Sequence, residues 1–215
     1  QSGYSESLKL EFVKFLRNEE GGEVSSDLIF DLSDPDFNGD QSVEQSIENG
    51  AEVIVLLPNT GELHDTLQVI KANKQRLPLL GGDDVYTPKT LEIGAEDANG
   101  MIVAIPWHIS ASQTDFRDTS QTLWKADVNW RTAMSYDATM ALIEGLKNNP
   151  TRKGLAQTLR SQNFMAEGAT GMVMFNQSGD RMGDRNRRIQ LVKIKAKGSK
   201  SRSGFHYEFI GASID

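Results

Sequence analysis

Short apolar runs alternate with helical patterns along the first half of the chain. The clearest runs, at 52–57, 77–80 and 101–105, are rich in aliphatic residues, as strands buried on both faces are. A further strand is predicted at 27–32. Helices are predicted at about 2–20, 42–49, 63–70 and 88–93. This alternation predicts an α/β fold with a doubly wound, mostly parallel sheet and right-handed crossovers.

The second half is patterned differently. A polar stretch at 110–130 leads to a long predicted helix at 131–147, which Pro150 ends. Thr151 is placed to cap another helix, and 168–175 is Gly-rich and then β-like. The long helix is expected to bury one stripe formed by Tyr136, Met140, Ile143 and Leu146. A turn at 176–180 and two strands, Arg188–Lys195 and Phe205–Ile210, complete the pattern.

The first predicted helix has no strand before it. A doubly wound sheet normally begins with a strand, and its absence leaves an open position with unpaired backbone groups. The opening Gln1-Ser2-Gly3 is typical of the middle of a loop, so we expect a piece of a longer chain. We also expect the open position to drive formation of a homodimer by exchange of a segment between chains.

Polar residues follow three of the predicted strands. Ligands of open parallel sheets bind outside the carboxyl ends of the strands, so these loops are expected to converge on one crevice. The candidate ligand-binding residues are Asn59, Thr60, Asp83, Asp84, Tyr86, Trp107 and His108.

The adjacent carboxylates Asp83 and Asp84 do not suit acid–base catalysis. Neighbouring residues of an extended loop point in opposite directions, whereas a catalytic pair needs both groups on one site. One of them can instead accept hydrogen bonds from a ligand ammonium group. The alternative is a Gly-Asp turn with solvated carboxylates. The sequence also lacks a serine-nucleophile elbow and a phosphate-binding glycine loop, so no enzymatic activity is expected.

Metal and cofactor sites are not expected. The chain has no cysteine, and its histidines, His64, His108 and His206, share no ligand spacing. The stretch 34–40 has the spacing of half a calcium loop, but the twelfth position is Gln45 where a bidentate glutamate belongs. A plain turn with a helix cap explains that stretch better.

The charge of the chain excludes some partners. A formal net charge of -7 argues against general nucleic-acid binding and against adsorption to anionic membranes. The basic run at 193–202 is interpreted as a solvated strand edge and turn. No run of about 18 apolar residues is present, so no membrane-spanning helix is predicted.

Four segments in this order give a resemblance to a known family. Tyr4-Ser5-Glu6-Ser7 leads into a helix that ends at Gly21-Gly22, and a strand begins at 50–56 with the letters GAEVIVL. A later helix contains Tyr136-Asp137-Ala138. Near the end, GATGMVMF at 168–175 is followed by Ser178-Gly179-Asp180. Together they resemble the second half of a type I periplasmic solute-binding protein, of the branched-chain amino-acid or amide receptor kind.

The resemblance implies a two-lobed clamp that closes on a small solute. It implies that 1–109 and 188–215 form the second, ligand-binding lobe, and that 110–187 is the crossover with helices of a partial first lobe. In the family an acidic residue after a strand holds the amino group of the solute, and the matching positions here are Asp83 and Asn59-Thr60. The N-terminal half of the family pattern, which supplies the carboxylate contacts, has no counterpart in this sequence.

The function expected from the resemblance is recognition of a small polar solute, such as an amino acid or amide, for uptake by an ABC transporter permease. That role implies a periplasmic or extracytoplasmic location. One version of it is a protein tethered to the membrane through a missing N-terminal segment. The alternative is a ligand-sensing domain of a receptor or regulatory protein with the same fold. A doubly wound enzyme is the third interpretation.

Overall fold

The computed structural model describes residues 2–19, 21–111, 115–147, 149–182, 189–197 and 206–211. The chain divides into two compact units, which are described separately. Unit 1 consists of Gln1–Ala104 and Leu191–Asp215, and unit 2 is Ile105–Gln190. The expected strand ends Arg188 and Phe205 lie outside the described residues. The assignment of the two parts to lobes, with borders at 109 and 188, remains a prediction.

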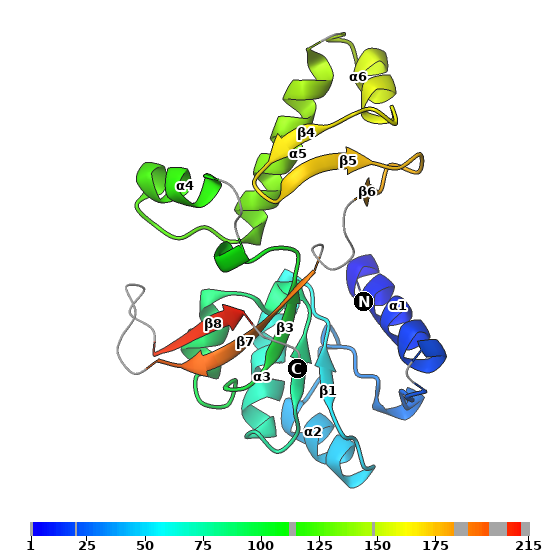
Figure 1. The fold of residues 1–215 in the computed structure, drawn as a ribbon. Coiled ribbons are helices and arrows are strands. Elements are labelled where there is room, and N and C mark those ends of the chain that lie inside the picture. The colour runs from blue at the N-terminus through cyan, green and yellow to red at the C-terminus, as the bar shows by residue number, and fades with distance from the viewer. Residues whose placement is uncertain are drawn as a thin grey trace. The chain divides into compact units, whose positions relative to one another are not determined.

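Unit 1 is built on a five-stranded sheet with the order β1-β2-β3-β7-β8 (Figure 1). Its strands are β1 Ile54–Leu56, β2 Leu79–Gly81, β3 Ile102–Ile105, β7 Gln190–Ala196 and β8 Tyr207–Gly211. The first three run parallel, with Val55 opposite Leu80 and Gly81 opposite Val103. The last two form an antiparallel pair. The predicted α/β fold with a mostly parallel sheet is confirmed.

Two helices precede β1, and a third connects β1 to β2. α1 spans Gly3–Glu19, α2 Gly39–Glu48 and α3 Leu63–Asn73, and a single π-turn at Thr90–Gly94 joins β2 to β3. Ile70 of α3, Val85 after β2 and Val103 of β3 are fully buried. Removal of these aliphatic side chains from water is the main stabilising term for such a layer.

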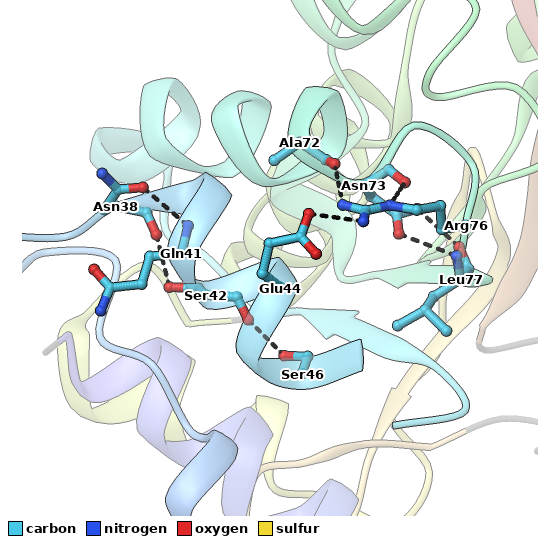
Figure 2. Close-up of polar contacts among 9 residues, drawn as sticks. All are labelled: Asn38, Gln41, Ser42, Glu44, Ser46, Ala72, Asn73, Arg76 and Leu77. Atoms are coloured by element: carbon cyan, nitrogen blue, oxygen red, sulfur yellow. Dashed lines mark hydrogen bonds and ion pairs between the residues drawn. The ribbon is translucent and has the colours of Figure 1, made fainter. Parts of the chain in front are cut away.

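Polar side chains fix the ends of α2 and α3 (Figure 2). The Asn38 side chain accepts the backbone N–H of Gln41 at 3.0 Å, which is an N-cap. The stretch 34–40 is therefore a turn and helix cap, as the sequence favoured. At the other helix, Arg76 donates to the backbone oxygens of Ala72 and Asn73 and forms an ion pair with Glu44 at 2.7 Å. These contacts satisfy carbonyls that the end of α3 leaves unpaired.

The strand predicted at 27–32 is not formed. Ser26–Leu28 is a short 3₁₀ turn, and Ile29 to Leu32 belong to no strand. Ile29 keeps 41% of its surface exposed. A strand needs a hydrogen-bonded neighbour, and within the described part of the chain the stretch 27–32 pairs with no strand of the sheet. The local sequence pattern is that of a strand, but the backbone of this stretch forms no pairing with the sheet.

Unit 2 contains three α-helices and a small antiparallel sheet among its described residues. The helices are α4 Phe116–Trp124, α5 Trp130–Leu146 and α6 Arg152–Leu159. The strands are β4 Ala166–Gly168, β5 Gly171–Phe175 and β6 Arg181–Met182. The Thr151 cap and the turn at 176–180 are confirmed: Thr151 accepts the N–H of Gly154, and Asn176 donates to the Asp180 oxygen. α4 was not predicted, because its stretch is polar.

The prediction of which face of α5 is buried is wrong. The buried positions are Ala133, Asp137, Ala141 and Gly145. Ile143 is 50% exposed and Tyr136 is 42% exposed. The helix lies so close to β4 and α6 that only small side chains fit: a Cβ added at Gly145 would lie 2.6 Å from the Leu155 side chain.

Candidate functional site

The candidate site in unit 1 lies where the parallel strands end. Because β1, β2 and β3 run parallel, their carboxyl ends meet at one edge of the sheet. The N–H of Gly82 donates to the Leu56 carbonyl at 2.9 Å, which joins the loops after β1 and β2 directly. The predicted convergence of these two loops is therefore present in the structure.

Tyr4 lies at this edge, and sequence reasoning did not include it among the site residues. It stands in the first turn of α1, and its hydroxyl donates a hydrogen bond to Oδ1 of Asp83. The two residues are 79 positions apart, so no local spacing could have brought them together. The first turn of α1 thus places a phenol next to the loop that contains Asp83 and Asp84.

Asp83 and Asp84 lie in one short 3₁₀ turn, Asp83–Val85, and both are half-buried. Oδ2 of Asp83 has no hydrogen-bond partner within the described residues, so it can accept from a ligand donor. Gly81 precedes this turn. A Cβ there would lie 2.4 Å from Val85 and 2.6 Å from Met101, so the strand end tolerates no side chain.

Asn59 is held in place by its own loop. Its side-chain oxygen accepts the N–H of Gly61 at 2.7 Å, and its side-chain and backbone N–H groups donate to the Glu62 carboxylate at 2.9 Å. This capping box occupies the polar atoms that a ligand would need. Thr60 is exposed, and its hydroxyl has no partner among the described residues. Of this pair, Thr60 is the more available to a ligand.

Tyr86 is positioned mainly by packing. Its ring lies 4.2 Å from the ring of Phe209 on β8, at an interplanar angle of 33°. Both rings are half-buried. The contact connects the loop after β2 to β8, at the opposite border of the same sheet. Such an aromatic pair stabilises the fold beyond the burial of its apolar surface.

Trp107 and His108 fall in unit 2. Trp107 is 3% exposed and packs edge-to-face on Phe116, with 6.0 Å between ring centres. His108 is 8% exposed, and its Nδ1 lies 2.6 Å from the Ser110 hydroxyl. The backbone N–H of His108 donates to Gln190 at 3.0 Å. Burial leaves the indole of Trp107 little surface for a ligand, and a ligand role for both residues remains a prediction.

An open hollow of about 490 Å³ borders Asn59 in unit 1. Its wall is largely polar and acidic, formed by Leu32, Ser33, Asp34, Pro35, Phe37, Asn59, Gly61, Glu62 and Asp65. Beside it, the Ser33 hydroxyl and the Ser33 N–H donate to the Asp31 carboxylate and lower the pKa of Asp31 below its usual value. Within the described residues, no group of three or more His, Asp or Glu could hold a metal ion.

The comparison with known sequences finds no relative. No protein-family model matches this sequence, and no curated protein matches it. No described helix is long and apolar enough to cross a membrane.

Solved structures with the same fold are solute-binding proteins. A leucine-binding protein from Thermotoga maritima MSB8 superposes with a TM-score of 0.74 at 20% identity, covering 97% of this chain and 57% of its own. An amino-acid ABC transporter substrate-binding protein from Pseudomonas fluorescens Pf-5 gives 0.71 at 18%, covering 100% and 57%. A solute-binding protein of an ABC transporter from Rhodopseudomonas palustris HaA2, solved with p-hydroxybenzoic acid, gives 0.65 at 18%, covering 97% and 57%.

These structures confirm the resemblance at the level of the fold, a lobe of the type I periplasmic-binding kind. The chain spans a little over half of the length of each, 57%. Chemically, the site in unit 1 offers a half-buried carboxylate, a phenol and an exposed hydroxyl at one sheet edge. Such groups bind a small polar molecule by hydrogen bonds.

Proposed function

We propose that this chain is part of an extracytoplasmic solute-binding protein that recognises a free amino acid or a similar amine-bearing solute. The observation that carries the proposal is the position of Asp83, which lies with Tyr4 at the carboxyl edge of a parallel sheet. An α-ammonium group placed there would donate to the open oxygen of Asp83. Thr60 and Asp84 are the neighbouring groups proposed to complete the polar contacts.

The charge at this edge favours amino acids over aromatic acids. Among the solved structures with this fold, one is described as leucine-binding and another was solved with p-hydroxybenzoic acid. A benzoate carries only negative charge, and a nearby carboxylate disfavours it. An amino acid has an ammonium group that pairs with Asp83, provided that its own carboxylate lies elsewhere. We therefore propose an amine-bearing solute.

The remaining parts of the proposal follow from this role. Unit 1 would be the second, ligand-binding lobe of a clamp, and unit 2 the crossover with part of the first lobe. Closure of two lobes would exclude water from the solute. The proposed partner is an ABC transporter permease, and the proposed location is periplasmic or extracytoplasmic.

A thermal-shift screen of free amino acids, amides and hydroxybenzoates tests the proposal, with the full-length native protein as the sample. A solute that binds only the folded state raises the melting temperature by mass action. We expect a rise with one class of amino acids and none with the benzoates. A shift with benzoates alone would contradict the role of Asp83, and flat curves with a cooperative transition would contradict solute binding.

The Asp83→Asn variant tests whether Asp83 binds the ammonium group of the solute. It keeps the size of the side chain and removes the charge, so affinity for the amino acid should fall about tenfold or more, measured by calorimetric titration. Asp97→Asn, on the loop before β3, is the matched control and should bind like the parent. Equal affinity of both variants would remove Asp83 from the site.

A sensory domain with the same fold is the second candidate. It shares the solute and the site, but it would act on a signalling partner rather than a permease. Reconstituted uptake in vesicles that contain the cognate permease separates the two roles. Solute binding without any stimulation of transport would favour the sensor.

A second copy of the chain is a further proposed partner. The homodimer predicted from the sequence has its physical basis in the border strand β1, which pairs on one side only within the described residues.

A further inference from the structure

The small antiparallel sheet of unit 2 has two chemically different faces. Successive side chains of a strand point to opposite faces of a sheet. On β5, Val173 is buried, whereas Met172 is exposed and Met174 is partly exposed. Val173 and Ala166 belong to the apolar cluster on the side of α5, against which β4 packs (Figure 1). The inner face of the sheet is therefore part of the core, and the outer face carries methionine.

Strand pairing places three methionines in one row across the outer face. β5 and β6 pair antiparallel, with Met174 directly opposite Met182. β4 and β5 also pair antiparallel, with Glu167 opposite Met172. Met165 lies two residues before Glu167, and Met174 lies two residues after Met172, so the same register puts Met165 opposite Met174. We call Met165, Met174 and Met182 the methionine row.

The methionine row is accessible from solvent. Met165 is 55% exposed and Met182 is 45% exposed. Directly opposite residues of an antiparallel pair have Cβ atoms about 4.5–5.5 Å apart. A methionine side chain is unbranched and has three rotatable bonds, so it adapts its shape readily. The sulfur atoms of the two outer residues can therefore reach a common point above Met174.

The chemistry of these side chains suits a soft metal ion. Thioether sulfur is a soft, uncharged ligand that selects copper(I), whereas carboxylates and carbonyls suit hard ions such as Mg²⁺ and Ca²⁺. The chain has no cysteine, so methionine supplies its only sulfur ligands. Glu167 is exposed beside the row on the same face. Its negative charge favours a cation nearby, and its oxygens compete poorly for a soft ion.

We propose that the methionine row is a binding site for one copper(I) ion, or for its chemical analogue silver(I). Each of the three sulfur atoms would donate one lone pair to the metal, and neither a proton nor an electron is transferred. Cysteine and histidine spacing gave no sign of this site, because strand pairing brings its ligands together. The site lies wholly in unit 2, so it does not depend on the solute proposed for unit 1.

A silver(I) titration of the whole chain in chloride-free buffer tests the proposal. The methyl NMR signals of all seven methionines are followed as the ion is added. We expect the signals of the methionine row to shift together and to stop shifting at one equivalent. Met101 is 1% exposed in unit 1 and serves as the internal reference that should not move. First-equivalent shifts outside the outer face of the sheet would overturn the proposal.

The pH dependence distinguishes thioether ligands from histidine. A thioether has no proton to lose at ordinary pH, so the affinity should be the same at about pH 5 and about pH 7.5. A site that used histidine would bind more weakly at the lower pH, because the ring must be neutral to bind a metal. A clear loss of affinity at pH 5 would therefore contradict the methionine row.

Leucine substitutions identify the ligands. Met174→Leu nearly keeps the volume of the side chain and removes the central sulfur. Its affinity for copper(I), measured without oxygen by competition with a coloured chelator, should fall about tenfold or more, since even indirect partners of a metal contribute that much. Met140→Leu, on α5, is the matched control and should bind like the parent. Equal affinity of the two variants would overturn the proposal, as would a chelator that keeps all the copper in the presence of the parent.

Discussion

At the scale of single residues, the Asp137 side chain connects α5 to several groups of unit 2. Its carboxylate is 3% exposed and accepts from the N–H of Ala169 at 2.5 Å and from the hydroxyl of Thr170. Arg181 approaches it at 2.9 Å and also donates to Thr170. A Cβ at Gly168 would lie 2.4 Å from the carboxylate, so only glycine fits there. One buried charge thus fixes the β4–β5 hairpin on α5.

Replacing Asp137 with alanine should therefore destabilise unit 2 strongly. The variant removes the acceptor of the Thr170 hydroxyl and the charge partner of Arg181, a loss of about 3 kcal/mol or more. Urea unfolding measures it. Asp118→Ala, at an exposed position of α4, is the matched control and should lie within about 0.5 kcal/mol of the parent. Equal stability of the two variants would contradict the role of the buried pair.

Ser33 should control the pKa of Asp31. The hydroxyl of Ser33 is the largest cause of the lowered pKa, followed by its backbone N–H. In Ser33→Ala the backbone bond remains, so the pKa should rise only part of the way to its usual value of 3.8. A carboxyl with a lowered folded pKa stabilises the protein above its unfolded pKa and loses that effect as the pH falls. NMR titration of the Asp31 side chain measures the shift, and an unchanged pKa would contradict this cause.

At the scale of elements, α5 shows where periodicity is insufficient. The apolar pattern correctly located the helix but selected the wrong face. Ala133, Ala141 and Gly145 lie against the rest of unit 2, because close approach needs small side chains. Tyr136 and Ile143, which belong to the predicted stripe, remain 42% and 50% exposed.

Substitutions on the two faces of α5 should give opposite results. Ala141→Leu inserts three carbons into a site that is 2% exposed, so it should cost about 1–3 kcal/mol of unfolding free energy. Ile143→Ala removes an exposed side chain and should change stability by less than about 0.5 kcal/mol. Both are measured by urea unfolding of the whole chain. A larger loss for Ile143→Ala would indicate that this face is covered in solution.

At the scale of the whole molecule, each unit has its own core. Val103, Val192 and Ile194 are fully buried in unit 1, while Phe164, Ala166 and Val173 form an apolar cluster in unit 2. Such units can fold as separate structures within one chain. The open border of β1 belongs to unit 1, so its effects should be independent of unit 2.

Light scattering of the chain should show a mass that rises toward that of two chains as the concentration increases. Exposed strand borders pair with other copies when nothing covers them. Ile54 and Leu56 bond toward β2, so the N–H of Val55 between them faces the border. Val55→Pro should weaken this association, because it removes that donor and keeps the β1–β2 bonds. A monomer at all concentrations would contradict the homodimer predicted from the sequence.

The sequence by itself determined the type and order of most elements of unit 1. Runs of aliphatic residues mark strands that are buried on both faces, and in unit 2 the cap Thr151 marks a helix start. It also placed Asp83 and Asn59 at strand ends, since that position follows from the order of the elements along the chain. These features depend on interactions between residues close in sequence.

Only the tertiary structure decided the features that need distant partners. The stretch 27–32 has a strand pattern but forms no strand, because within the described residues it pairs with no strand of the sheet. Tyr4 bonds to Asp83, Tyr86 packs on Phe209, and Trp107 lies in the core of unit 2, each through contacts that no local spacing encodes. Backbone hydrogen bonds between strands and close packing of small residues are properties of the assembled layers, so a linear pattern cannot specify them.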